Sequence, residues 1–244
     1  MKRRTLIASL AFGAAFIAVG GCSKTDEGTA AKKVINVAVS PASPPNLFEE
    51  AGQTKGLDYD LFDGYCKARG CTMNITAYDW QGMLGAVVSK KADVAFSGIS
   101  ITEPRTKVMD FSKPYMDNTW NLVSLKSRNI KLTNLDTLKN YKIGFPRGMA
   151  YMDFIKTDQV KLYPSYNEVL TDLQNGQVDL AFLDGTVASV YAKKLPIQDS
   201  YVFTGFDRFG FAFPKGSALK ADFDKYLDEL GPQKKQAIID KWMQ

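Results

Sequence analysis

Two segments of similar pattern carry the residues of this chain that are best suited to binding chemistry. Residues 92–98 read ADVAFSG and residues 178–185 read VDLAFLDG, so each is a short apolar run that ends in small or acidic residues. The first continues through small polar residues to Arg105, and the second reaches Asp184. A guanidinium and a carboxylate from different parts of a fold can hold the two ends of a zwitterion.

Histidine is absent from the 244-residue sequence, which restricts the catalytic chemistry. The absence excludes Ser-His-Asp and Cys-His catalysis and removes the most common zinc ligand. An enzyme of this composition would depend on carboxylates, lysines or tyrosines. We expect neither a metal ion nor another cofactor.

Apolar periodicity predicts an α/β fold that positions these residues, because strand and helix patterns alternate along the chain. Strands are predicted at residues 34–39, 72–77, 93–97, 142–145, 161–163 and 179–183, and helices at 57–69, 80–90, 102–108, 150–156, 166–175, 187–194, 218–230 and 232–242. Strands that are apolar on both faces belong to mainly parallel sheets covered by helices. Such sheets bind ligands at the carboxyl ends of their strands.

Two extended segments, residues 122–125 and 209–213, are predicted to cross between two lobes. Lobe 1 then comprises residues 34–122 and 209–244, and residues 123–208 form an inserted lobe 2. The two crossings would provide a hinge that closes the lobes over a ligand.

The amino terminus is predicted to be an export signal rather than part of the fold. The positive residues 2–4 (KRR) precede an apolar stretch that is short for a membrane-spanning helix. This stretch ends AVGGC, which resembles the bacterial lipobox and implies lipidation of Cys22. We expect a lipoprotein signal peptide at residues 1–21 and a polar tether at residues 22–33. The alternative is an N-terminal anchor that is never cleaved.

The formal net charge of +5 is partly a property of this signal, because three of the 31 Lys and Arg residues lie in it. The remaining sequence is close to charge balance. It contains no cluster of Lys and Arg, so we expect no nucleic-acid partner.

Cys66 and Cys71 are the cysteines that remain after Cys22, and export places them in an oxidising compartment. They flank Gly70, where a predicted helix ends and a strand begins. A disulfide across so short a loop would contribute about 2 kcal/mol in the chain-entropy model. Two buried free thiols are the alternative.

Several motifs, in their order and spacing, resemble the bacterial extracellular solute-binding proteins that serve ABC importers of polar amino acids. The most specific is SGISITEPR at residues 97–105. The shorter ones are GLDYDL at 56–61, WQGML at 80–84, VMDFSKPY at 108–115, IGF at 143–145 and VDLAFLD at 178–184. The resemblance covers about residues 34–242. It implies a two-lobed, type II periplasmic-binding-protein-like fold, each lobe a mainly parallel sheet flanked by helices.

Carried over residue by residue, the resemblance implies ligand-binding roles for Gly98, Ser100, Arg105, Asp184, Trp80, Ala150 and Met149. Arg105 is expected to pair with the ligand's α-carboxylate, with backbone N–H groups near Ser100 and Ala150 completing that site. The Gly98 carbonyl, the Ser100 hydroxyl and the Asp184 carboxylate are expected to accept from the α-ammonium. Without the resemblance, Arg105 could pair on the surface with Glu103 or Asp110. Asp184 could be a helix cap or turn residue.

Two departures from the family pattern leave the ligand's side chain undetermined. Residues 148–150 read GMA where the family has hydroxyl side chains, and residues 40–46 lack the acid that some binders of basic amino acids use. We expect Trp80 to wall the side-chain pocket, unless it belongs to the core. An Arg147 that faced the pocket would favour an acidic or amide ligand. The lesser candidates for this pocket are Phe48, Met149 and Arg147.

The resemblance therefore implies a substrate-binding lipoprotein of an ABC importer, not an enzyme, that captures a polar or charged amino acid by hinge closure. The expected partners are this ligand, the permease membrane subunits and, through Cys22, a membrane. We expect a monomer in the periplasm or at the cell surface. One alternative is a secreted cyclohexadienyl (prephenate or arogenate) dehydratase, with Glu168, Glu103 and Asp153 as available carboxylates. Another is a ligand-sensing partner of a chemoreceptor or an adhesive surface lipoprotein.

Overall fold

The computed structural model describes residues 32–150, 152 and 155–244. The predicted signal peptide, Cys22 and most of the tether lie outside the described residues, as does part of the helix predicted at 150–156. In the described ranges, no helix has both the length and the apolar character needed to cross a membrane.

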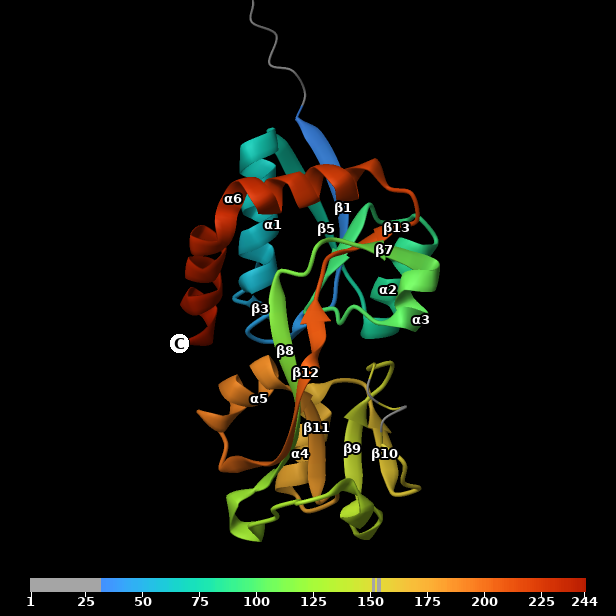
Figure 1. The fold of residues 1–244 in the computed structure, drawn as a ribbon, viewed down its shortest axis with the longest axis vertical. Coiled ribbons are helices and arrows are strands. Elements are labelled where there is room, and N and C mark those ends of the chain that lie inside the picture. The colour runs from blue at the N-terminus through green and yellow to red at the C-terminus, as the bar shows by residue number, and fades with distance from the viewer. Residues whose placement is uncertain (1–31, 151, 153–154) are drawn as a thin grey trace, which may run out of the picture. The chain divides into compact units, whose positions relative to one another are not determined.

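Two five-stranded sheets form the framework of residues 32–244 (Figure 1). Their strand orders are β5-β1-β6-β13-β7 and β10-β9-β11-β8-β12. In each sheet four strands run in one direction and one strand, β13 or β8, runs in the other. The prediction of mainly parallel sheets is therefore confirmed. We call the first sheet and its helices lobe 1, and the second sheet and its helices lobe 2.

The strands of lobe 1 are β1 (Lys33–Val39), β5 (Cys71–Ala77), β6 (Val94–Phe96), β7 (Met109–Phe111) and β13 (Ala212–Pro214). Those of lobe 2 are β8 (Met116–Leu125), β9 (Ile143–Pro146), β10 (Val160–Tyr163), β11 (Leu180–Asp184) and β12 (Ile197–Phe209). The central strands β6 and β11 are buried along their whole length, as their uninterrupted apolar sequences predict.

Helices cover both sheets and begin and end where local chemistry predicts. In lobe 1, α1 (Leu57–Arg69) ends at Gly70, which has the left-handed conformation (φ 66°) that favours glycine. The helix α2 (Trp80–Val88) is capped by Asp79, whose Oδ1 accepts the Gly82 N–H at 2.6 Å. The remaining helices are α3 (Glu103–Val108), α4 (Tyr166–Gln174), α5 (Gly185–Ala192) and α6 (Ala218–Met243), with 3-10 turns η1 (Lys126–Arg128) and η2 (Leu135–Asn140).

Helix α6 contains the break that separates the two predicted C-terminal helices. Gly231 has non-helical angles (φ 74°, ψ 164°) and is followed by Pro232. A glycine accepts this backbone conformation, and proline begins the next helical turn without a missing hydrogen bond. The prediction of two helices is therefore confirmed.

The long strands β8 and β12 pair with each other and carry the chain between the sheets (Figure 1). The chain leaves lobe 1 after β7 at residues 112–115 and returns between β12 and β13 at residues 210–211. Residues 122–125, predicted as a crossing, lie inside the second sheet, because this apolar run pairs with β12 and β11. The second sheet also includes residues 116–122, which the predicted boundary assigns to lobe 1. The lobe boundaries remain a prediction.

A small third sheet was not predicted from the sequence. It consists of β2 (Ala42–Ser43), β3 (Leu47–Glu50) and β4 (Gln53–Lys55). Strands of this length and polarity have too little apolar alternation to be recognised. The sheet precedes α1 and positions residues 44–46 near the site described below.

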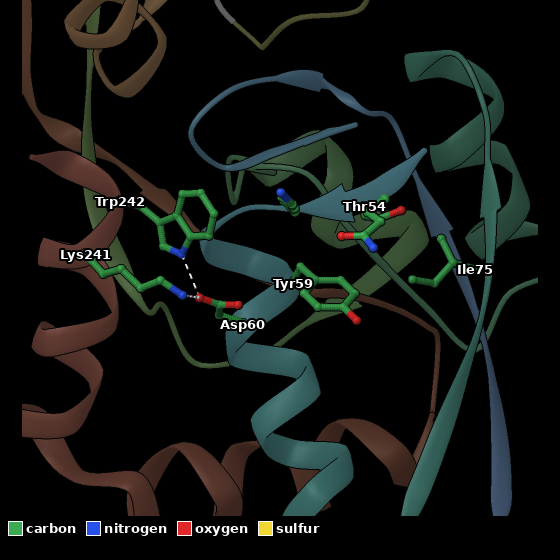
Figure 2. Close-up of a pocket in the computed structure, with 8 residues that line it drawn as sticks. Thr54, Tyr59, Asp60, Ile75, Lys241 and Trp242 are labelled. Atoms are coloured by element: carbon green, nitrogen blue, oxygen red, sulfur yellow. Dashed lines mark hydrogen bonds and ion pairs between the residues drawn. The ribbon is translucent and has the colours of Figure 1, made fainter. Parts of the chain in front are cut away.

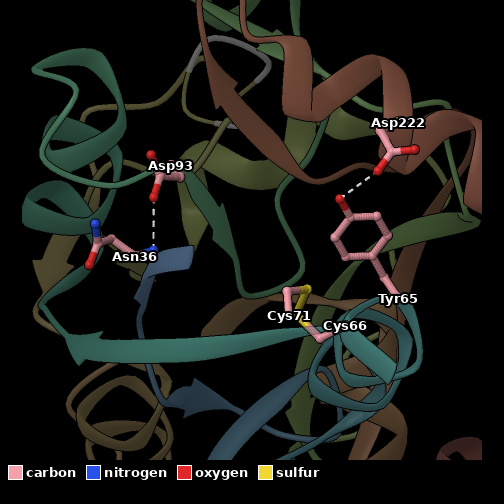
Figure 3. The surroundings of a disulfide bond; sticks show 6 residues. All are labelled: Asn36, Tyr65, Cys66, Cys71, Asp93 and Asp222. Carbon is pink, nitrogen blue, oxygen red and sulfur yellow. Dashed lines mark hydrogen bonds between the residues drawn. A yellow bond between two sulfur atoms is a disulfide. The ribbon is translucent and has the colours of Figure 1, made fainter. Parts of the chain in front are cut away.

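The Cys66–Cys71 disulfide connects the end of α1 to the start of β5 (Figure 3). Both cysteines are buried in an aromatic core that includes Phe62, Phe96 and Phe223. Of the two states considered for these cysteines, the structure has the disulfide.

Candidate functional site

Arg105 lies in the first turn of α3 in lobe 1 and reaches lobe 2. Its guanidinium is buried and donates to the Ser100 carbonyl at 3.0 Å and to the Gly148 carbonyl of lobe 2 at 3.0 Å. The ring of Trp80 lies beside it, with the centroid 5.5 Å from Cζ. Trp80 Nε1–H donates to the same Gly148 carbonyl at 3.1 Å.

The surface ion-pair alternative for Arg105 is wrong. Glu103 pairs with Lys107 at 2.9 Å, and Asp110 pairs with Lys215 at 2.9 Å. Arg105 instead contributes a buried cation to the contact between lobes, a placement suited to a carboxylate ligand.

Gly148 is required where the lobes meet. Its φ of 75° is left-handed, and a Cβ at this position would lie 2.5 Å from Gln81 Nε2 and 3.1 Å from Trp80 Cδ1. Only glycine combines this conformation with so close an approach of its backbone to lobe 1.

Asp184 ends β11 in lobe 2 and is 3% exposed. Its Oδ2 accepts from the Tyr166 hydroxyl at 2.5 Å, and its Oδ1 accepts from Asn118 Nδ2 at 2.9 Å. The residue occupies the N-cap position of α5, but its side chain makes no capping hydrogen bond. The cap alternative therefore does not explain why an acid is buried there.

A second buried carboxylate, Asp207, lies close to Asp184. Asp207 is on β12 and is 4% exposed. Asn118 Nδ2 donates to Asp207 Oδ2 at 2.6 Å as well as to Asp184, so one amide joins the two acids. The same oxygen of Asp207 accepts from Trp120 Nε1 at 2.7 Å and from the Ser100 hydroxyl at 3.2 Å.

Gly98 lies in close contact with Asn46. Its φ is 66°, and a Cβ would lie 2.5 Å from Asn46 Nδ2. Its N–H donates to Asp58 Oδ2 at 2.7 Å. Asn46 in turn donates to Thr186 Oγ1 of lobe 2 at 2.9 Å, a further hydrogen bond between the lobes.

A cavity of about 610 Å³ opens beside Arg105 and is lined by both lobes. Its lining includes Arg105, Met149, Ala150, Trp120, Phe206 and Asp207. The rings of Trp120 and Phe206 meet edge to face at 4.8 Å, and Phe206 is 50% exposed. The register between β8 and β12 shifts between Phe203 and Asp207, and Phe206 lies within this irregularity.

The structure brings most of the predicted site residues together. Arg105, Met149 and Ala150 line the cavity. Trp80 and Ser100 contact Arg105. Ser100 bonds directly to Asp207, and Asp184 is connected to Asp207 through Asn118. Trp80 is not among the lining residues; of the described residues, Trp120 and Phe206 are the aromatic ones that line the cavity.

Of the three lesser candidates for the side-chain pocket, Met149 lines the cavity, whereas Arg147 and Phe48 do not. Arg147 is exposed and does not line the cavity. Phe48 packs against Trp242 at 5.7 Å, on the side of lobe 1 that carries another hollow of about 700 Å³ (Figure 2). In that hollow Asp60 accepts from Lys241 at 2.6 Å and Trp242 at 2.8 Å, so its charge is matched.

The carboxylates considered for a dehydratase are not grouped in the cavity. Glu103 lines it but is paired with Lys107, and Glu168 accepts from Ser165 at the start of α4. Asp153 lies outside the described residues. Within the described part of the chain, no group of three or more His, Cys, Asp or Glu residues is arranged to hold a metal ion.

Sequence reasoning missed Asp207, Asn118, Trp120 and Tyr166. Asn118 and Trp120 are two residues apart on β8 and therefore share a face, which was a detectable signal. Asp207 gave no such signal, because it lies in an irregular part of a strand whose residues alternate poorly.

Residues 35–244 match the model of one protein family, the bacterial extracellular solute-binding proteins, family 3. The chain belongs to this family. A similar curated relative is the arginine-binding periplasmic protein of Mannheimia haemolytica, 29% identical over 225 residues, which are 85% of this chain and 90% of the relative. The L-cystine-binding protein TcyJ of Escherichia coli is 27% identical, over 84% of this chain and 81% of its own.

Solved structures agree with this assignment. The arginine-, lysine-, histidine-binding protein ArtJ of Geobacillus stearothermophilus is similar with a TM-score of 0.78 and 29% identity, over 86% of this chain and 95% of that chain. The two-lobed fold expected from the sequence is therefore confirmed.

Proposed function

We propose that this chain is the substrate-binding lipoprotein of an ABC importer and that it captures an amino acid between its lobes. The observation that carries the proposal is that a buried cation of lobe 1 and a buried acid of lobe 2 are both connected to Ser100 by hydrogen bonds. Arg105 of lobe 1 is buried against Gly148 of lobe 2, and Asp184 of lobe 2 connects through Asn118 and Asp207 to Ser100 of lobe 1. Family membership and the names of the relatives support the same ligand class.

In this proposal Arg105 binds the α-carboxylate with its two N–H edges, helped by backbone N–H groups near Ser100 and Ala150. Asp184, the Ser100 hydroxyl and the Gly98 carbonyl accept from the α-ammonium. Met149 and Trp80 shape the surroundings, Met149 at the cavity wall and Trp80 against the guanidinium.

Closure follows from the distribution of these groups. A ligand shifts an equilibrium between open and closed lobes only by binding one state more tightly. Contacts divided between the lobes achieve this, because both sets form only in the closed state. The closed form is then the one that the permease subunits recognise, and the binding protein acts as a monomer without catalysis.

The amino-terminal part of the proposal rests on the sequence. Residues 1–21 would be removed and Cys22 lipidated, so that the tether holds the binding lobes at a membrane in the periplasm or at the cell surface. Mass spectrometry of the protein from a bacterial membrane fraction tests this, since a Cys22→Ser variant should lose the lipid mass and leave the membrane.

The ligand site is tested with Arg105→Ala in a thermal-shift and calorimetric screen of the common amino acids. We expect the wild-type protein to bind at least one of them and the variant to lose about 100-fold or more in affinity, because charge-assisted hydrogen bonds contribute about 1.5–3 kcal/mol each. Lys107→Ala is the matched control: Lys107 is an exposed cation on the same helix, and its ion pair among the described residues is with Glu103. Equal affinities in Arg105→Ala and Lys107→Ala would contradict the proposal.

The same preparation tests the absence of catalysis. Incubation with prephenate and arogenate should leave both compounds unchanged. Turnover that depends on Glu103 would show that the chain is a dehydratase instead.

A further inference from the structure

Asp207 has an incomplete set of hydrogen bonds although it is almost fully buried. Its Oδ2 accepts from Ser100, Asn118 and Trp120, which are all neutral donors. Its Oδ1 is buried and has no hydrogen-bond partner among the described residues. A buried carboxylate oxygen without a donor is costly, so a donor from outside the chain is expected at this position.

The side-chain amide of Asn118, next to Asp207, also lacks a hydrogen-bond donor from the described residues. Asn118 gives its Nδ2 to both carboxylates, and its Oδ1 is also buried without a partner within the described ranges. Both orphan atoms are therefore acceptors. A group that carries several N–H donors, such as an ammonium or guanidinium, satisfies acceptors of this kind.

The hydrogen-bond donors to Asp207 also leave its charge without a neighbouring cation among the described residues. The adjacent cation, Arg208, is exposed on the opposite face of the strand, whereas Asp207 is buried. If Arg105 takes the α-carboxylate and Asp184 the α-ammonium, as proposed above, the charge of Asp207 remains for the ligand's side chain.

The cavity wall next to Asp207 suits a cation as well. Asp207, Trp120 and Phe206 line the same cavity, and the two rings are in contact. Aromatic faces attract ammonium and guanidinium groups and pack against the methylene chains that carry them.

We propose that Asp207 is a specificity-determining residue that makes this site select amino acids with a cationic side chain. This inference rests on the proposed function and adds the ligand class to it. The acid that residues 40–46 lack is then supplied from β12, on the other side of the site.

The test compares L-arginine with L-citrulline, its nearly isosteric neutral analogue, by calorimetry on the full mature chain. We expect the wild-type protein to bind L-arginine at least tenfold more tightly than L-citrulline. In Asp207→Asn, which keeps the shape of the side chain, this ratio should fall by about tenfold, with L-citrulline affinity changed much less. Asp199→Asn is the control, because Asp199 is an exposed acid on the same strand that accepts from Asn121.

The outcomes separate the two proposals. Equal wild-type affinity for L-arginine and L-citrulline would overturn the selectivity of Asp207 and leave amino-acid binding intact, even if the variant failed to fold. A loss in Asp207→Asn of the same size for both ligands would show that Asp207 serves only the α-ammonium, and would also overturn it. Failure of every common amino acid to bind would instead refute the proposed function.

Discussion

Asp58 shows how a single residue connects the core of lobe 1 to the candidate site. Its carboxyl group is fully buried and accepts from the Tyr115 hydroxyl at 2.5 Å and the Gly98 N–H at 2.7 Å. Burial raises its pKa from 3.8 to about 7, and these two hydrogen bonds offset only part of that rise. The same surroundings raise the pKa of Tyr115, through burial first and then through the charge of Asp58.

The raised pKa of Asp58 predicts a pH-dependent stability. The folded state binds this proton more tightly than the unfolded state, so the stabilisation is complete below about pH 4 and is lost as the pH rises through 7. Because one pKa unit corresponds to about 1.4 kcal/mol, the free energy of unfolding should fall by a few kcal/mol more in the wild type than in Asp58→Asn between pH 4 and pH 8. Urea unfolding over this range measures the difference. Parallel profiles for the two proteins would contradict the assignment.

At the residue scale, the sequence was most informative where a motif was local. Residues 97–105 pointed to Ser100 and Arg105, and both contribute to the site geometry. Asp207 and Trp120 could not be found in this way. Their roles depend on the pairing of two strands that are distant in sequence, and a single sequence does not encode that register in any local pattern.

At the element scale, the disulfide between α1 and β5 gives a measurable contribution to stability. It closes a loop with a sequence separation of 5, for which the chain-entropy model gives about 2 kcal/mol. The double variant Cys66→Ser/Cys71→Ser should therefore unfold with a free energy lower by about this amount. Its ligand affinity should remain that of the wild type, because neither cysteine lines the cavity. An unchanged free energy of unfolding would count against a structural role.

Elements with strong local signals were predicted well. The helix at Leu57–Arg69 matches its predicted bounds, since Gly70 ends it, and the break at Gly231 divides α6 as expected. Residues 122–125, predicted as a crossing, lie in the paired part of β8. An apolar run without turn residues is compatible with both a connecting segment and an interior strand, and only pairing with β11 and β12 distinguishes them.

At the scale of the whole molecule, the hydrogen bond from Asn46 to Thr186 predicts an effect on closure. Thr186→Val keeps the size of the side chain but leaves the buried Asn46 amide without its acceptor when the lobes are closed. An unsatisfied buried donor costs about 1–3 kcal/mol, so ligand affinity should fall roughly tenfold. The radius of gyration at saturating ligand, measured by X-ray scattering, should still show closure.

The matched control is Thr171→Val, which removes an exposed hydroxyl of α4 that donates to the Asn167 carbonyl of the same helix. This variant should bind as the wild type does. If both valine variants bind equally well, the contact between Asn46 and Thr186 does not contribute to the closed state.

The sequence by itself determined the alternation of strands and helices, the family, and the two charged residues Arg105 and Asp184. These properties follow from apolar periodicity and short motifs, which are local in the chain. Only the tertiary structure decided which residues complete the site, because β8, β12 and the loops of both lobes bring their side chains together across long separations. Burial then gives Asp58 its raised pKa and leaves Asp207 with an unpaired oxygen, since both effects arise from the exclusion of water by distant parts of the fold.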